Sequence, residues 1–304
     1  MKILVTGANG QLGFDMVNEL LKRGHSVIGT DIFDHGLVEN NDRYSYVQMD
    51  LTKASATEKV KEIAPDAIIH CAAWTAVDAA EDEENREKVY AINVTGTAHL
   101  VDAAVKLDCR FLYLSTDYVF DGQGTEPWKP DDRSYAPLCY YGETKLKGEF
   151  EVSRLDKFFI VRIAWVFGRN GKNFIRTMIN VGKTHDEVRV VNDQFGTPTY
   201  TLDLARLLVD MAETEKYGYY HATNEGGYIS WYDFTCEIYR QAGYTVKVIP
   251  VTTEEYGLSK AKRPVNSRLD KSKLVKNGFT PLPDWKDALA RYLKEIHNNG
   301  TDQG

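Results

Sequence analysis

Hydrophobic and polar positions alternate along the first half of the chain in a way that predicts strands and helices in turn. Hydrophobic residues recur at helical spacing in Leu12–Arg23, Ala56–Ile63, Glu84–Lys106 and Tyr141–Val152. Runs rich in β-branched and aromatic residues, which are typical of buried strands, occur at Ile3–Thr6, Ser26–Thr30, Tyr44–Met49, Ala67–Cys71, Arg110–Leu114 and Phe158–Arg162. Because strands that alternate with helices form a parallel sheet covered on both faces, the sequence predicts an α/β fold with a doubly wound parallel sheet.

The pattern becomes looser after Val166, where prolines and polar loops separate shorter elements. The predicted helices are Phe174–Val181, Thr201–Glu213, Trp231–Ala242 and Trp285–His297, and the predicted strands are Val188–Val191 and Tyr219–Ala222. We expect a sheet domain over residues 1–165, to which residues 188–224 return. Residues 166–187 and 225–304 should form a smaller lobe, interleaved with the sheet domain, that binds a substrate.

The composition and net charge of the chain limit the kinds of binding partner and the cellular compartment that we expect. The formal net charge is −7 and the basic residues are scattered, which argues against a nucleic acid or an anionic membrane surface. No apolar run approaches the roughly 20 residues that span a bilayer. The four cysteines lie far apart and form no CxxC pair, so scattered thiols in a reducing compartment are expected rather than disulfides or zinc. We therefore expect a cytoplasmic protein.

Glycines follow the first predicted strand with the spacing GxxGxxG, at Gly7, Gly10 and Gly13. Glycine permits a sharp turn and a close approach of the backbone to a pyrophosphate. The following helix, which begins near Leu12, offers free N–H groups and the positive end of its dipole, and Gln11 and Leu12 are expected to contact the cofactor there. A glycine triplet alone is also compatible with a plain tight turn. Its place between a strand and a helix favours the phosphate loop of a Rossmann dinucleotide site.

Asp31 ends the second predicted strand, where a carboxylate can accept hydrogen bonds from the adenosine ribose. A carboxylate at this position repels a 2′-phosphate, so NADH is favoured and NADPH remains possible. A solvated aspartate at a strand end is the alternative interpretation. Further cofactor contacts are expected where the next two strands end, at Asp50, Leu51, Ala72, Ala73 and Thr75.

Tyr141 and Lys145 form a YxxxK pair on one face of a predicted helix. A phenol normally titrates near ~10, and a neighbouring ammonium makes it a better acid–base catalyst. Tyr256 and Lys260 have the same spacing, so the pattern alone carries little weight. The first pair differs because Thr116, at the end of the fifth strand, can hydrogen-bond a substrate carbonyl oxygen. An aromatic anchor at Tyr141 and a helix cap at Thr116 are the alternatives without catalysis.

With these motifs the chain resembles the extended short-chain dehydrogenase/reductase family, and within it the branch of dTDP-4-dehydrorhamnose reductases. The resemblance covers nearly the whole sequence. It rests on Gly7–Gly13, His70–Asp78, Ser115–Phe120, Tyr140–Lys145, Arg162–Phe167, Asn192–Thr199 and Arg263–Leu269.

The resemblance implies that Thr116, Tyr141 and Lys145 are catalytic, and that Tyr141 and Lys145 also contact the cofactor. The residues that it places at the sugar nucleotide are Thr116, Asp117, Tyr118, Trp165, Asn173 and Arg263. The implied reaction is hydride transfer from NAD(P)H to C4 of dTDP-4-dehydro-6-deoxy-L-mannose, which gives dTDP-L-rhamnose. Tyr141 would protonate the C4 oxygen, and the dTDP-sugar is the expected partner.

Some members of this family dimerise through Mg²⁺ held by glutamates. Here the corresponding positions carry Asp15 and Leu202, and only Glu295 is a glutamate. We therefore expect no metal and a monomer or weak homodimer.

Two other functions remain open at this stage. One is a nucleotide-sugar 4-epimerase or 4,6-dehydratase of the same fold, although Thr116-Asp117-Tyr118 stands where a dehydratase often has Thr-Asp-Glu. The other is a non-catalytic NAD(P)-binding regulatory subunit, which would not need Thr116, Tyr141 and Lys145 together.

Overall fold

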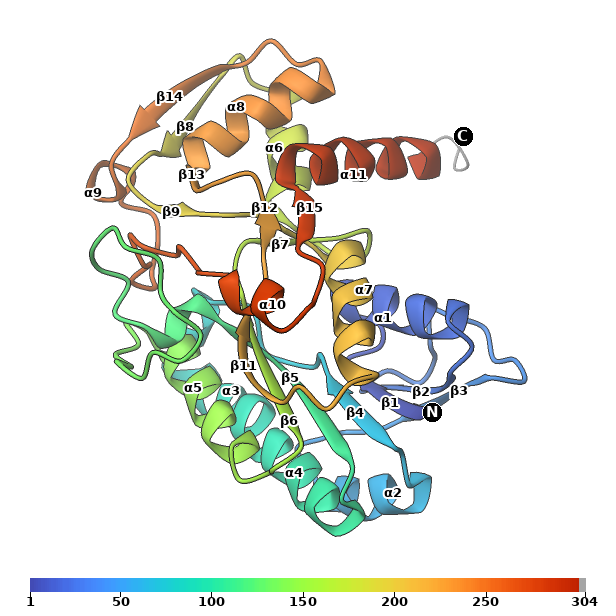
Figure 1. Cartoon of the computed structure of the whole chain (residues 1–304). Coiled ribbons are helices and arrows are strands. Elements are labelled where there is room, and N and C mark those ends of the chain that lie inside the picture. Colours follow the sequence, from blue (N-terminus) through green and yellow to red (C-terminus); the bar gives the residue numbers. More distant parts are fainter. Residues whose placement is uncertain (301–304) are drawn as a thin grey trace.

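A parallel sheet of seven strands forms the centre of the larger domain in the computed structural model, which describes residues 1–300 (Figure 1). In order across the sheet, the strands are β11 (Gly218–His221), β6 (Phe158–Ile163), β5 (Arg110–Thr116), β4 (Ala67–His70), β1 (Lys2–Thr6), β2 (Ser26–Asp31) and β3 (Tyr44–Gln48). The order reverses at β1, which pairs with β2 on one side and β4 on the other. The expected doubly wound sheet is confirmed, and its ligand site belongs at this reversal.

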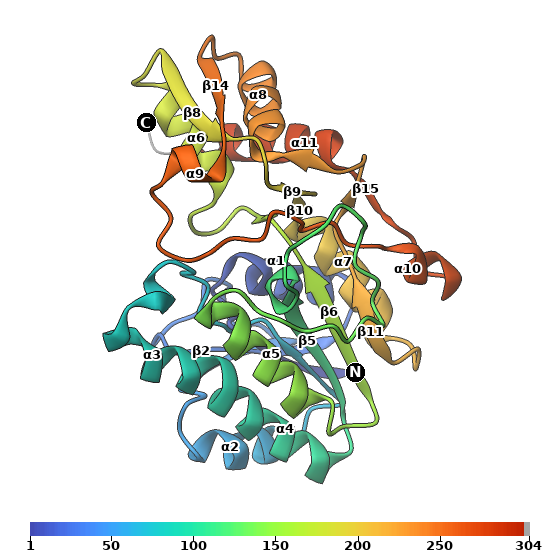
Figure 2. The same ribbon diagram turned by 90° about the vertical axis from the view of Figure 1, so that its left-hand side faces the viewer.

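Helices cover both faces of the sheet because each has one hydrophobic side (Figure 2). One face packs against α2 (Ser55–Ile63), α4 (Gly96–Leu107) and α5 (Tyr140–Val152), with Val60, Leu100 and Val152 fully buried. The other face packs against α1 (Gln11–Lys22) and α7 (Thr201–Ala212), whose Leu20 and Leu208 are also fully buried.

The long helix expected over Glu84–Lys106 is interrupted. Two helices, α3 (Glu83–Tyr90) and α4, are joined by a π-helical turn at Ala91–Thr95. Within this turn the Asn93 side chain accepts a hydrogen bond from the Trp74 N–H at 2.8 Å and donates one to the Thr144 hydroxyl at 3.0 Å. These tertiary hydrogen bonds hold Asn93 within the π-helical turn. Hydrophobic spacing contains no sign of them, so it predicts one regular helix. π-Helical turns of this kind are frequent at functional sites.

The smaller lobe lies above the sheet domain in Figures 1 and 2. Its core includes Ile175, Phe234, Ile238 and Leu289. Its main elements are α6 (Phe174–Gly182), β8 (Glu187–Val191), α8 (Trp231–Ala242), β14 (Lys247–Val251), α9 (Thr253–Tyr256) and α11 (Trp285–Gly300). Short paired strands connect it to the sheet domain, at β7 (Val166–Phe167), β9 (Phe195–Gly196), β10 (Thr199–Tyr200), β12 (Asn224–Glu225), β13 (Ile229–Ser230) and β15 (Leu282–Asp284).

The division between the two parts differs from the expected one. Strand β8 pairs with β14 of the smaller lobe, so residues 188–191 do not return to the main sheet as the sequence suggested. In contrast, α10 (Ser272–Lys276), which was expected in the smaller lobe, contacts β11. Leu274 and Phe279 belong to the core on the face of the sheet that α1 and α7 cover. Hydrophobic runs indicate that a strand is buried but not which strand it joins. Residues 301–304 of the expected lobe lie outside the described residues.

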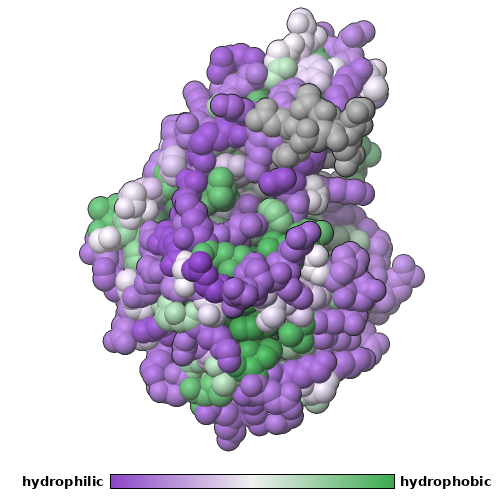
Figure 3. Space-filling view, turned by 90° about the vertical axis from the view of Figure 1, so that its right-hand side faces the viewer, coloured by the Kyte–Doolittle hydropathy of each residue, from purple (hydrophilic) through white to green (hydrophobic). Residues whose placement is uncertain are grey.

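The face of the molecule seen in Figure 3 is mostly hydrophilic, with hydrophobic residues gathered in a few small areas. None of the helices described within residues 1–300 is long and apolar enough to cross a membrane. All four cysteines are free thiols.

Candidate active site

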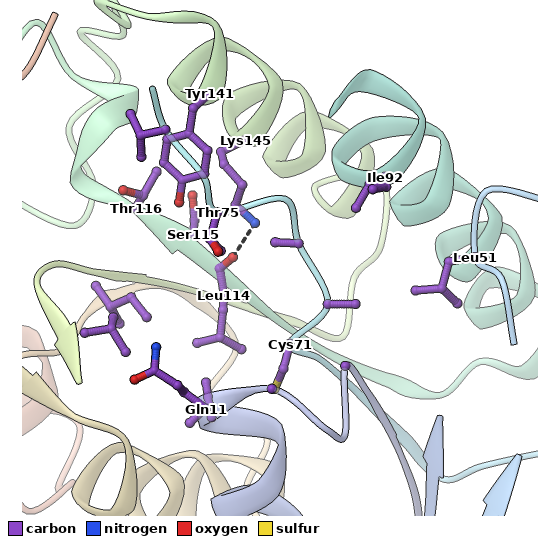
Figure 4. A pocket seen from close by; sticks show the side chains of 18 of the residues that line it. Gln11, Leu51, Cys71, Thr75, Ile92, Leu114, Ser115, Thr116, Tyr141 and Lys145 are labelled. Carbon is purple, nitrogen blue, oxygen red and sulfur yellow. Dashed lines mark hydrogen bonds between the residues drawn. The ribbon is translucent and has the colours of Figure 1, made fainter. Parts of the chain in front are cut away.

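A cavity of about 790 Å³ opens at the carboxyl ends of β1, β2, β4 and β5, beside the reversal of strand order. It continues toward the smaller lobe, because Trp165 and Lys172 belong to its walls. Figure 4 shows one end at Tyr141, Lys145 and Thr116, and another at Leu51 and Ile92, with Gln11 on a third side. The same cavity is therefore lined by the glycine loop and by the YxxxK pair.

The glycine loop forms the turn that a bound pyrophosphate requires. Gly7 has a φ of +65°, and a Cβ there would lie 2.7 Å from the backbone nitrogen of Ala72. Gly10 is the N-cap of α1 and provides no capping side chain, so the first N–H groups of the helix remain available to an anion. Gly7, Gly10, Gln11 and Leu12 line the cavity as expected.

Gly13 has a different position from the expected one. It does not line the cavity, and a Cβ there would overlap the carbonyl oxygen of Gly7. Its role in this structure is to let the first turn of α1 pack against the loop. The regular glycine spacing cannot distinguish a residue that faces the ligand from one that packs behind it.

Two buried hydroxyl groups in the cavity wall fit a polar ligand. Thr30 Oγ1 and Ser115 Oγ are buried, line the cavity and have no hydrogen-bond partner within residues 1–300. Buried polar groups are normally paired, so these two indicate positions where a ligand supplies the partner. Sequence reasoning missed both, although Ser115 directly precedes Thr116 at the same strand end.

Asp31 is held at the end of β2 with its carboxylate in the cavity wall. One carboxylate oxygen accepts a hydrogen bond from the Ile32 N–H at 2.8 Å, and the other from the Asn9 N–H at 3.2 Å. The apolar side chains of Leu51 and Ile92 line the same cavity and lie on one side of it, away from Tyr141 and Thr116 (Figure 4). The expected contacts Asp50, Ala72, Ala73 and Thr75 also line the cavity.

Replacing Asp31 with serine should shift cofactor preference toward NADPH. The loss of a carboxylate next to the 2′-phosphate should raise the ratio of kcat/KM for NADPH over NADH roughly tenfold, or about 1.4 kcal/mol. The control is Asp34→Ser, since Asp34 is exposed, pairs with His35 and does not line the cavity. An equal ratio in the wild type and Asp31→Ser would mean that the carboxylate does not read the ribose.

Tyr141 projects from α5 toward Thr116 at the end of β5, and Lys145 points to the neighbouring Leu114 of the same strand (Figure 4). Burial raises the pKa of Tyr141 above its ordinary value, so the phenol keeps its proton. The Lys145 ammonium donates to the carbonyl oxygen of Leu114 at 2.7 Å and lies 4.1 Å from the centre of the Tyr113 ring. These contacts hold the Lys145 amine against β5, and within residues 1–300 it forms no ion pair with a carboxylate.

The titration of Lys145 should set a pH limit on activity. Burial lowers the pKa of Lys145 to about 7, and the carboxylate of Glu149 opposes part of this shift. As the pH rises through this value the ammonium loses its proton, so kcat/KM of the free enzyme should fall above it. Lys145→Arg keeps a charge throughout and should move the fall to higher pH. An unchanged profile in that variant would assign the fall to another group.

In this structure Thr116 donates its hydroxyl proton to the neighbouring carboxylate of Asp117. Its hydroxyl donates to Asp117 Oδ1 at 3.0 Å and accepts from the Tyr118 N–H at 3.2 Å. The second carboxylate oxygen of Asp117 accepts a hydrogen bond from the Ser267 hydroxyl. Burial raises the pKa of Asp117 to about 6. Polarisation of a substrate carbonyl by Thr116 therefore requires its hydroxyl to turn from Asp117 toward the substrate.

The substrate end of the cavity is aromatic. Tyr118 lies edge-on to Tyr141, with ring centres 5.5 Å apart, and both line the cavity together with Asp117 and Trp165. Trp165 has a φ of +51°, a left-handed conformation that costs a bulky residue about 1–3 kcal/mol. Such a conformation persists only where the surroundings hold it, and here it places an indole at the cavity wall.

Asn173 and Arg263, which were expected to contact the sugar or pyrophosphate, are not among the residues that line the cavity. The Asn173 amide caps α6 and donates to Gly168 O, Tyr292 Oη and Gln11 Oε1, at 3.0, 2.9 and 3.3 Å. Arg263 pairs with Asp78 at 2.5 Å and donates to the Tyr118 hydroxyl at 3.3 Å. Asn173 thus links the loop at Gly168 to Gln11 beside the glycine loop. Arg263 supports the Tyr118 hydroxyl from outside the cavity.

Lys88 and Lys172 are the cavity cations that sequence reasoning missed. Lys172 comes from the polar loop after β7, and the Gln11 side chain donates to its carbonyl oxygen at 3.3 Å. No spacing rule connects this loop with a glycine loop so far away in the sequence, so only the fold brings them together.

Two positions that the resemblance associates with a metal, Asp15 and Glu295, are engaged with hydroxyl groups. Asp15 accepts a hydrogen bond from the Thr201 hydroxyl at 2.5 Å, and Glu295 accepts one from the Tyr200 hydroxyl at 2.8 Å. Among the described residues, no group of three or more histidine, cysteine or acidic side chains is arranged to hold a metal ion.

Comparisons with known proteins cover nearly the whole chain. The family model described as RmlD substrate binding domain matches residues 1–298. A solved dTDP-4-dehydrorhamnose reductase from Clostridium acetobutylicum is 42% identical, has a TM-score of 0.89, and matches over 98% of this chain and 100% of that chain. A Bacillus anthracis reductase of the same name, solved in complex with NADP, is 37% identical with a TM-score of 0.84, over 97% of this chain and 99% of that chain.

The Bacillus subtilis spore coat polysaccharide biosynthesis protein SpsK is 36% identical, over 97% of both chains. The resemblance to dTDP-4-dehydrorhamnose reductases is thereby confirmed at the level of the family. The chain belongs to the RmlD substrate-binding family, which includes the dTDP-4-dehydrorhamnose reductases.

Proposed function

We propose that this protein reduces the C4 keto group of dTDP-4-dehydro-6-deoxy-L-mannose to give dTDP-L-rhamnose, with NADH or NADPH as the reductant. The observation that carries the proposal is the single cavity that joins the glycine loop to Thr116, Tyr141 and Lys145. The similarity of the full chain to reductases of this name supports the choice of substrate.

The roles of the residues follow from their positions. A bound nicotinamide supplies the hydride. Tyr141 keeps its proton because burial raises its pKa, and it delivers that proton to the C4 oxygen as negative charge develops there. Lys145 stabilises the resulting phenolate and contacts the nicotinamide ribose, while Thr116 polarises the carbonyl. Asp117, Tyr118 and Trp165 orient the sugar nucleotide.

The residues of the cavity suit the cofactor. The N-terminus of α1 and the open Gly7–Gly10 turn would hold the pyrophosphate, and the apolar side chains of Leu51 and Ile92 would contact the adenine. Asp31 makes NADH the preferred form. NADPH should also serve as a substrate of this protein. The Bacillus anthracis relative, which was solved in complex with NADP, supports this. Ser115 and Thr30 offer hydroxyl groups to polar atoms of the ligand.

The expected setting is the cytoplasm, since the cysteines are free thiols and both ligands are nucleotides. The expected assembly is a monomer or weak homodimer that needs no metal. Light scattering with and without EDTA tests this: the molar mass should be the same in both. A dimer that dissociates on chelation would contradict the assignment.

The test of the function is oxidation of NADH and NADPH against a panel of nucleotide-linked 4-keto sugars. One dinucleotide should be consumed for each dTDP-4-dehydro-6-deoxy-L-mannose reduced. A 4-epimerase would recycle its cofactor and consume none, a dehydratase would release water from a different substrate, and a regulatory subunit would show no turnover. Any of these three results would overturn the proposal.

A further inference from the structure

Two stacked indoles stand at the substrate end of the cavity, and only one of them lines it. The Trp165 and Trp231 rings lie with their centres 3.7 Å apart and their planes within 17° of each other. Trp165 lines the cavity, whereas Trp231 does not, so Trp231 lies behind it. Trp231 starts α8 and belongs to the smaller lobe. The smaller lobe therefore meets the substrate site through this contact.

Trp231 is itself firmly held. Ser230 caps α8 in a reciprocal arrangement with Asp233, and its hydroxyl also lies 2.7 Å from the amide oxygen of Asn192. The Trp231 ring packs against Phe174 of α6, with centres 4.5 Å apart. The start of α8 is fixed by its cap and its neighbours, which makes Trp231 a rigid backing for the ring in front of it.

Trp165 depends on this backing. Its left-handed backbone conformation is one that a bulky residue adopts only when its surroundings impose it. Along one edge the ring abuts Gly196, where a Cβ would lie 2.9 Å from the Trp165 Cε2 atom. The backbone is tied by the Thr199 N–H, which donates to the Trp165 carbonyl oxygen at 3.1 Å. Gly196 thus limits the ring at its edge and Trp231 covers one of its faces.

We propose that Trp231 is a positioning residue for the sugar substrate: it holds the Trp165 indole in place as a flat apolar surface at the cavity wall. A deoxysugar with one apolar side packs against such a surface. This role rests on the proposed function, because it names the sugar nucleotide as the ligand that Trp165 meets. Because Trp231 belongs to the smaller lobe, substrate affinity should also depend on how that lobe packs against Trp165.

The experiment compares Trp231→Leu, Trp231→Phe and the control Trp285→Phe. Trp285 is 2% exposed in the same lobe core and lies edge-on to Phe234, and within residues 1–300 it makes no ring contact of its own with Trp165 or Trp231. Loss of the stack in Trp231→Leu should raise KM for the sugar nucleotide roughly tenfold, with kcat within about twofold and NADH affinity unchanged. Trp231→Phe keeps an aromatic backing and should recover most of the affinity, and Trp285→Phe should leave KM as it is.

A spectroscopic readout separates this proposal from the proposed function. The Trp165 and Trp231 rings are stacked with centres 3.7 Å apart. Because transitions of indoles this close couple electronically, we expect a paired positive and negative band in far-ultraviolet circular dichroism of the wild type. The paired band should disappear in Trp165→Phe and in Trp231→Leu and persist in Trp285→Phe, whatever substrate the enzyme uses. A paired band that survives in Trp231→Leu would overturn the proposal. So would an unchanged KM in that variant, or an equal rise of KM in Trp285→Phe.

Discussion

Replacing Tyr141 with phenylalanine should lower kcat by about 10²–10⁴-fold, the usual contribution of a well-placed general acid. The variant removes one oxygen and leaves the ring that packs edge-on against Tyr118. The cofactor end of the cavity, from the glycine loop to Asp31, is not changed. NADH should therefore bind with its wild-type affinity, measured by the fluorescence of the dinucleotide, while its steady-state oxidation is almost lost.

The chain supplies a matched control for this variant. Tyr256 and Lys260 repeat the YxxxK spacing, but Tyr256 lies on α9 of the smaller lobe and Lys260 pairs with Asp82. Tyr256→Phe should keep wild-type turnover. If Tyr141→Phe kept it as well, the phenol would have no part in proton transfer, and the proposed mechanism would be wrong.

Replacing Glu149 with glutamine should lower the free energy of unfolding by about 3–5 kcal/mol, the loss typical of breaking a buried ion pair. Arg162 and Glu149 are fully buried, and the guanidinium makes two hydrogen bonds to the carboxylate, at 2.8 and 2.7 Å. Glutamine keeps the shape of the side chain but leaves the guanidinium without its counter-charge. Urea denaturation of the two proteins measures the difference.

The control for this loss is an ion pair made by Glu151, two residues after Glu149 in the sequence. Glu151 lies on α5 and pairs at 2.7 Å with Arg154, which follows the end of the helix, and the two side chains are exposed to solvent at 30% and 50%. Glu151→Gln should lower the free energy of unfolding by less than about 1 kcal/mol. Equal losses in the two variants would show that burial of the Arg162–Glu149 pair is not what makes it important.

Glu149→Gln should also change the pH profile. Glu149 lies one turn beyond Lys145, and its charge raises the pKa of the ammonium against the lowering caused by burial. Without that charge Lys145 should lose its proton at lower pH, so the fall of kcat/KM should begin earlier. A profile unchanged from the wild type would contradict the link between the ion pair and the catalytic amine.

The sheet and both ends of the cavity could be predicted because their signals are local in the sequence. Strands of parallel sheets are continuous hydrophobic runs, and the Gly7–Gly13 and Tyr141–Lys145 spacings lie within single turns or helices. Strand ends in such a fold meet at one edge. Asp31 and Thr116, far apart in the chain, therefore fall into one cavity as expected.

The structure differs from the sequence-based expectations where a residue's partner is supplied only by the tertiary structure. Asn173 and Arg263 have side chains suited to a sugar nucleotide. In the structure, however, Asn173 donates a hydrogen bond to the Tyr292 hydroxyl, and Arg263 pairs with Asp78. Strand β8 has the composition of a sheet strand and finds its partner in the smaller lobe. Trp231 was predicted only as part of a helix, because nothing in the sequence links it to Trp165.

The central claim is that hydride passes from the dinucleotide to C4 of the sugar. The most direct test is a single turnover with NADH that carries deuterium at the transferring position of the nicotinamide, followed by NMR of the sugar nucleotide. Deuterium should appear at C4 of dTDP-L-rhamnose, with one equivalent of NAD⁺ formed. Deuterium that stays in the dinucleotide, or enters the sugar at another carbon, would contradict that claim.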